Sequence, residues 1–181
     1  MVAPSPLRAA PIPNEGATAS DPAIPFRTHS SKEGVVAHTF FHGATSTWQY
    51  VVADSETKDA ILIDVALDFD PATSSITTTT AESLLHFVDS QGYKVNKILE
   101  THAHADHLTA AQYLKQRLQA PVGIGKGIKA VQARFGDIYG IPMAELEHAF
   151  DELFEDGQCF PLGRSQCSVV HLPGHTPDHV G

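Results

Sequence analysis

The sequence predicts an α+β domain in which a run of neighbouring strands is followed by alternating strands and helices. Three short β-rich segments, at 35–41, 49–53 and 60–64, predict a β-meander, and a polar turn at 54–59 separates the last two. Further along, apolar residues recur at helical spacing directly after strand-like runs. A sheet covered by helices is built from elements in this order.

The helices are predicted from apolar residues repeated every three or four positions. One helix is expected over 80–89, where Gly92 provides a stop. A strand at 95–99 follows it, and the next apolar stripe predicts a helix that His107 opens. A further helix is expected over 128–135. The segment after residue 99 is therefore a strand-to-helix loop.

This loop holds three histidines and one aspartate within six positions, at 102–107. Imidazole and carboxylate groups at this density are costly to desolvate unless a cation binds them. In an extended segment His102, His104 and Asp106 point to one side, and His107 approaches from the start of the helix. A solvated histidine-rich loop is the alternative, but the strand–loop–helix context favours a metal site.

A second histidine-bearing loop, Pro-Gly-His-Thr-Pro-Asp-His, lies at 173–179 after another strand-like run. Alone, His175 would be read as a turn residue bonded to backbone, but beside the first cluster it is a candidate metal ligand. The position of His179 leaves two roles open. It either faces the same pocket or lies at its periphery.

Together these two motifs resemble the metallo-β-lactamase fold superfamily, whose signature is a His-x-His-x-Asp-His loop followed later by a Gly-His-Thr loop. The resemblance extends over residues 35–181 and implies an αββα sandwich, of which this chain holds the N-terminal part. The residues flanking the first motif, at 99–101 and 108–111, are similar to the persulfide dioxygenase branch. Glyoxalase II enzymes are the nearest alternative branch.

The resemblance implies oxidation of glutathione persulfide by O2 at a mononuclear Fe(II), giving sulfite and glutathione. It also implies that His102 and His175 bind the iron, that His104 is a further candidate ligand, and that Asp106 and His107 shape the catalytic pocket. The residues alone leave two alternatives open. One is a Zn(II)-dependent thioesterase of the glyoxalase II type with two metals, and the other is a non-catalytic metal-binding remnant.

In that family an aspartate downstream of the Gly-His-Thr loop completes the iron site, and the glutathione-binding residues follow it. The printed sequence ends at Gly181, before either. We therefore expect the 181-residue chain on its own to be impaired as a dioxygenase. We also expect it to associate, for example as a homodimer, through an unpaired sheet edge.

Composition limits the remaining possibilities. The net charge of -9 and the lack of any Lys/Arg-rich block argue against nucleic-acid or anionic-membrane partners. No apolar run approaches the roughly 20 residues of a membrane span, so we expect a soluble protein. Residues 1–34 are rich in proline, which predicts a disordered tail before a domain at 35–181. Arg8 in that tail leaves a mitochondrial as well as a cytoplasmic location open.

Overall fold

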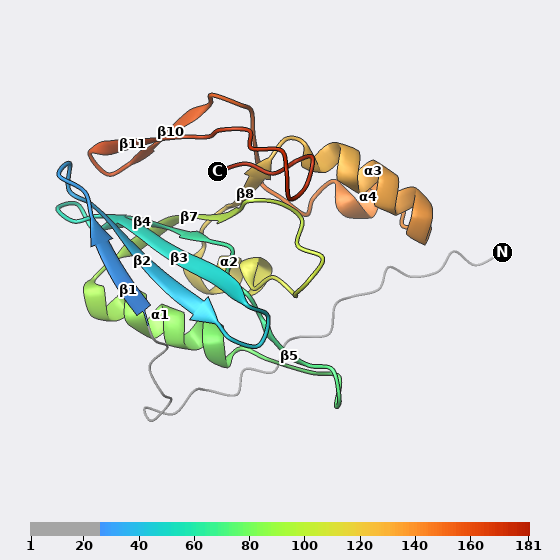
Figure 1. The fold of residues 1–181 in the computed structure, drawn as a ribbon, viewed down its shortest axis with the longest axis horizontal. Coiled ribbons are helices and arrows are strands. Elements are labelled where there is room, and N and C mark those ends of the chain that lie inside the picture. The colour runs from blue at the N-terminus through green and yellow to red at the C-terminus, as the bar shows by residue number, and fades with distance from the viewer. Residues whose placement is uncertain (1–25) are drawn as a thin grey trace.

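A seven-stranded mixed sheet forms the centre of the computed structural model, which describes residues 26–181 (Figure 1). Its strands follow the order β1-β2-β3-β4-β7-β8-β9. Their bounds are β1 Phe26–Ser30, β2 Val35–His42, β3 Thr47–Asp54, β4 Asp59–Ile63, β7 Lys94–Glu100, β8 Val122–Gly125 and β9 Glu152–Phe154. Two short ribbons accompany it, β5 Asp68–Asp70 with β6 Ser75–Thr77, and β10 Cys159–Leu162 with β11 Ser165–Ser168.

The order of strands reflects the two kinds of connection in the chain. β1 to β4 pair antiparallel through short turns, as the predicted meander requires. From β4 onward the pairs β4–β7, β7–β8 and β8–β9 are parallel, because helices make the crossovers. These helices are α1 Thr79–Gln91, α2 Ala111–Leu118, α3 Ile128–Tyr139 and α4 Met143–Leu146. Among residues 26–181, no helix is long and apolar enough to cross a membrane.

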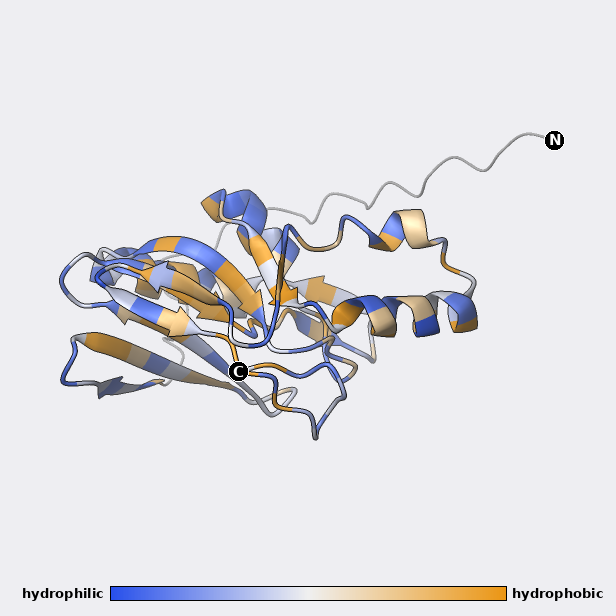
Figure 2. Ribbon diagram, turned by 90° about the horizontal axis from the view of Figure 1, so that it is seen from above, coloured by the Kyte–Doolittle hydropathy of each residue, from blue (hydrophilic) through white to orange (hydrophobic). Residues whose placement is uncertain are grey.

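Each face of the sheet carries its own apolar core. On one face, residues such as Leu84 of α1 and Leu114 of α2 pack on Val51, Leu62 and other apolar strand residues. On the opposite face the β10–β11 ribbon covers a smaller cluster, made of Ile61, Phe154, Phe160, Leu162 and Val169. Figure 1 shows α1 and the β10–β11 ribbon on opposite sides of the sheet, and Figure 2 shows apolar segments along the strands. The central strands are therefore buried on both faces.

Two sequence predictions need correction. The predicted tail extended to residue 34, but Phe26–Ser30 forms β1 and pairs with β2. Phe26 provides the reason, because its ring lies 5.3 Å from that of Phe40 and 4.7 Å from that of Phe87. The rest of the tail, residues 1–25, lies outside the described residues. The second correction concerns α2, which begins at Ala111, so His107 lies in a loop and does not open the helix.

The prediction for α1 is confirmed and extended by a residue or two at each end. Helix α1 spans Thr79–Gln91, and Gly92 ends it with a φ of 68°. The backbone N–H of Gly92 bonds the carbonyl of Asp89, as expected for a left-handed glycine cap. The third predicted helix, over 128–135, is also present and continues to Tyr139.

The parallel pairing of β4 and β7 places the candidate metal loop. Ile63 pairs with Leu99, so Asp64 and Glu100 follow side by side where the two strands end. The backbone N–H of Asp64 donates to the carbonyl of Leu99 at 3.0 Å. The carboxyl ends of parallel strands are the usual place for ligand sites in such sheets. Residues 101–107 leave the sheet at this point.

Gly163, in the turn between β10 and β11, gives a test of how the second face is closed. Its φ is +59°, and a Cβ there would lie 2.6 Å from the Cβ of Asp54 and against the hydroxyl of Thr57. Gly163→Ala should therefore lower the free energy of unfolding by at least about 1–2 kcal/mol, the cost of the left-handed conformation alone. Urea unfolding measures this. Gly43→Ala is the control, because nothing lies within 4 Å of its added Cβ, and equal losses in both variants would contradict the account.

Candidate metal centre

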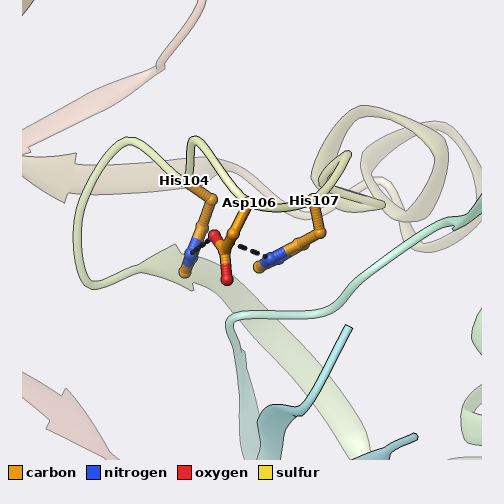
Figure 3. Close-up of side chains that lie close together, drawn as sticks. All are labelled: His104, Asp106 and His107. Carbon is orange, nitrogen blue, oxygen red and sulfur yellow. Dashed lines mark ion pairs between the residues drawn. The ribbon is translucent and has the colours of Figure 1, made fainter. Parts of the chain in front are cut away.

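The loop after β7 folds so that its three histidines lie against one another. The ring centroids of His102 and His104 are 4.2 Å apart, and those of His104 and His107 are also 4.2 Å apart. Figure 3 shows the carboxylate of Asp106 between His104 and His107. Its Oδ1 lies 3.3 Å from His107 Nδ1 and 3.9 Å from His104 Nδ1. The loop is bent rather than extended, so the predicted alternation of faces is wrong, although the predicted cluster forms.

The second loop brings two more imidazoles to the first. The ring of His175 is 4.8 Å from that of His102 and nearly perpendicular to it. The ring of His179 is also 4.8 Å from His102, with the planes 18° apart, so the two rings stack. A hydrogen bond of 2.9 Å from the backbone N–H of Val180 to the carbonyl of Thr101 joins the two loops. The ring of His179 thus lies against the metal loop, at His102.

Two buried acids that the sequence analysis did not select hold this arrangement. Asp64 Oδ1 lies 3.0 Å from His104 Nε2 and accepts the backbone N–H of Thr101 at 2.8 Å. Its Oδ2 accepts the Thr101 hydroxyl, also at 2.8 Å. Glu100 Oε2 lies 3.1 Å from the same His104 nitrogen. The available signal was an acid at the end of each of two apolar strands, where a carboxylate rarely stays buried unpaired.

These contacts separate the histidines by charge. Burial and the neighbouring His104 lower the pKa of His102 to about 4, and burial likewise lowers the pKa of His107. Burial also opposes charge on His104, but the hydrogen bond to Asp64 and the neighbouring carboxyl group of Glu100 outweigh it and raise the pKa of His104 to about 10. Burial raises the pKa of Glu100. The pocket therefore presents neutral rings at His102 and His107 around one cationic ring.

The residues fit a transition-metal ion. Neutral imidazole is the form that binds iron or zinc, and it does so through a bare ring nitrogen. Among the described residues, His107 Nε2 and His179 Nδ1 are buried and have no hydrogen-bond partner. Ligand atoms of His104, Asp106 and His107 lie within 4.8 Å of one another, and so do those of Asp64, Glu100 and His104. The five predicted site residues thus converge, with His179 beside them.

A mixed sheet with a histidine-lined pocket at the carboxyl ends of its strands defines a metal-binding α+β protein. The particular family follows from the sequence. Residues 42–181 match the Metallo-beta-lactamase superfamily, and the chain belongs to it. A metallo-beta-lactamase from Staphylococcus aureus has the same fold, with a TM-score of 0.59, 19% identity, and coverage of 81% of this chain and 36% of that one. The predicted fold class is confirmed.

The chain is similar in sequence to proteins that carry different functional names. A Beta-lactamase hydrolase-like protein of Xylella fastidiosa is 44% identical over 138 residues, 76% of this chain and 32% of that protein. Glyoxylase B2 of Dictyostelium discoideum is 36% identical over 141 residues, 74% and 47% of the two chains. The mitochondrial persulfide dioxygenase of Homo sapiens is 27% identical over 146 residues, 81% and 46%. The chain therefore spans from a third to a half of these relatives' lengths.

Metal content tests the assignment of ligands. His102→Ala and His175→Ala each remove an imidazole from a small ligand set, so we expect bound metal to fall to near background in both. His107→Ala should weaken metal binding by about 10–100-fold if the residue acts only around the ligands. Elemental analysis after dialysis against buffered Fe(II) or Zn(II) measures this. His86→Ala on α1 is the control, because His86 is exposed and remote in sequence from both loops.

Metal content in His175→Ala equal to that of the parent would contradict the assignment of His175. A loss in His107→Ala as complete as that in His102→Ala would instead favour a second metal held by the Asp106–His107 half of the loop.

The ion pairs of His104 with Asp64 and Glu100 predict that the stability of the metal-free protein depends on pH. Because the pKa of His104 is raised from 6.5 to about 10, the stabilisation it contributes is fully present below pH 6.5 and is lost as the pH rises through about 10. His104→Gln should therefore reduce Tm most near pH 6.5, and the difference from the parent should shrink toward pH 10. Thermal unfolding in a chelating buffer measures both chains. A difference in Tm that does not change over this range would contradict the ion pair.

Proposed function

We propose that this chain forms the metal-binding part of a persulfide dioxygenase, which uses a mononuclear Fe(II) and O2 to oxidise glutathione persulfide. The observation that carries the proposal is the unequal treatment of the histidines. His104 lies against two buried acids, whereas the rings of His102 and His175 meet at 4.8 Å and have no carboxylate partner in the described part of the chain. A cationic ring competes with a metal, so this arrangement favours one ion bound by few imidazoles over two closely spaced ions.

In this proposal each residue has a definite task. His102 and His175 supply the two imidazoles of a two-histidine, one-carboxylate set, which leaves open positions for dioxygen and a sulfur ligand. When bound there, Fe(II) supplies the oxygen chemistry. Asp64 and Glu100 fix the ring of His104, and that ring packs on His102 and limits its orientation. Dioxygen and water convert the outer persulfide sulfur to sulfite, and the glutathione thiol and two protons are released.

A cavity of about 550 Å³ beside His175 supports a substrate of tripeptide size. Small side chains of the metal loop, Ala103 and Ala105, line it together with helix α3 and the segment at 171–178. Arg134 of α3 lines this cavity and contributes a guanidinium group. A guanidinium matches the carboxylates of glutathione.

A zinc-dependent glutathione thioesterase is the second candidate. Two observations favour it, namely the similarity to Glyoxylase B2 and the closeness of the ligand atoms of His104, Asp106 and His107. Those three residues would hold a second zinc, and two zinc ions would activate a water between them. The two candidates differ in metal, in metal count and in the bond that breaks.

The deciding experiment loads the purified chain with Fe(II) under anaerobic conditions, or with Zn(II), and supplies glutathione persulfide or a glutathione thioester. We expect iron-dependent oxygen uptake with sulfite formation, above that of free Fe(II), and no thioester cleavage by either form. Thioester cleavage with two zinc ions per chain, without sulfite formation by the iron form, would overturn the proposal.

A further inference from the structure

A continuous series of hydrogen bonds runs from the candidate metal loop to the start of α1. His107 Nδ1 lies 3.3 Å from the hydroxyl of Thr47, which lies 2.8 Å from the hydroxyl of Thr45. The Thr45 hydroxyl lies 2.6 Å from His42 Nδ1, and His42 Nε2 lies 3.1 Å from Asp68 Oδ1. The hairpin of β2 and β3 supplies the three middle members of the series, His42, Thr45 and Thr47.

At the Asp68 end of the series, the donor and the acceptor can be assigned. The carboxylate accepts the backbone N–H of Thr80 at 2.8 Å and also the Thr80 hydroxyl, at the beginning of α1. Both carboxylate oxygens of Asp68 therefore act as acceptors in this geometry. His42 Nε2 must therefore carry the hydrogen that bonds Asp68. His42 is 5% exposed, so its ring has little freedom to bond water instead.

The donor at Asp68 fixes the donor of every other hydrogen bond in the series, because each threonine hydroxyl has a single proton to donate. When the His42 ring carries a single hydrogen, on Nε2, its Nδ1 accepts and Thr45 donates to it. The oxygen of Thr45 then accepts from Thr47, and the oxygen of Thr47 accepts from Nδ1–H of His107. At the far end, the side chain of His107 is fully buried, and its Nε2 has no partner among the described residues.

We propose that Asp68, His42, Thr45 and Thr47 are positioning residues that fix the tautomer of His107. They place its proton on Nδ1 and leave the lone pair of Nε2 buried and without a hydrogen-bond partner among residues 26–181. A ring prepared in this way offers Nε2 to a metal or to a proton without rearrangement. The inference concerns the metal-free chain, so it holds for the dioxygenase and for the thioesterase alike.

Asp106 offers a competing explanation of the His107 tautomer. Its carboxylate lies 3.3 Å from the same Nδ1 and would also favour a hydrogen on that nitrogen. However, the Asp106 side chain is 60% exposed, so water competes for its oxygens. Thr45 separates the two explanations. Its hydroxyl bonds His42 and Thr47 and makes no bond to His107, so changing it acts on the tautomer only through the series.

The test reads the tautomer of His107 directly. The ¹⁵N-labelled chain is kept metal-free in a chelating buffer at about pH 8, where ordinary histidines are neutral. Long-range ¹H–¹⁵N correlation of the imidazoles distinguishes Nδ1–H from Nε2–H, and His107→Gln assigns the signals. We expect Nδ1–H in the parent. In Thr45→Val the freed Thr47 hydroxyl can donate to Nδ1, so the tautomer ratio should shift about fivefold toward Nε2–H, as the loss of one hydrogen bond allows.

Three further variants make the result decisive. Thr45→Ser keeps the hydroxyl and should retain the parent ratio, and Thr39→Val in the middle of β2 controls for the loss of a threonine from this hairpin. Thr47→Val is a second way to break the series and should shift the ratio in the same direction if Thr45→Val does not fold. An Nε2–H tautomer in the parent would overturn the proposal. So would a parent-like ratio in Thr45→Val or Thr47→Val, because Asp106 alone would then explain the tautomer.

Discussion

The carboxylate of Asp64 is the constraint on which the site depends. It accepts the backbone N–H and the hydroxyl of Thr101 and contacts His104, so it ties the end of β4 to the loop that leaves β7. A φ of +53° at Asp64 turns the chain back toward the neighbouring strand. Removing one partner of such a buried network leaves charged or polar groups unsatisfied, which costs more than the bond itself contributes. The parallel pairing of β4 and β7 therefore determines the geometry of the loop that follows β7.

This constraint gives the histidines different characters. One ring nitrogen of His104 faces two acids, whereas the rings of His102 and His175 meet and contact no carboxylate among residues 26–181. His107 is governed from the other side of the pocket, by the β2–β3 hairpin through Thr47. Histidines that are close in sequence thus receive different partners from different strands. A protein can tune a metal through such outer partners without changing the ligands.

The sequence predicted the part of this architecture that is local. Helix α1 and its end at Gly92 follow from apolar spacing and a left-handed glycine, which need no tertiary information. The clustering of His102 with His175 was predicted from two motifs and their family resemblance. Asp64 and Thr47 were missed because their contacts with His104 and His107 join residues 40 and 60 positions apart in the sequence. Glu100 is only four residues from His104, but it meets that ring only because the loop bends. Strand β1 was missed because the aromatic contacts of Phe26 outweigh its proline-rich surroundings.

The central claim is that one metal ion sits between the loop after β7 and the Gly-His-Thr loop. A crystal of the chain grown with Fe(II) in anaerobic conditions, measured on both sides of the iron absorption edge, tests it most directly. We predict one strong anomalous peak, at about 2.0–2.2 Å from a ring nitrogen of His102 and from one of His175. A peak bound only by His104, Asp106 and His107, or two peaks about 3.5–4 Å apart, would contradict the mononuclear account.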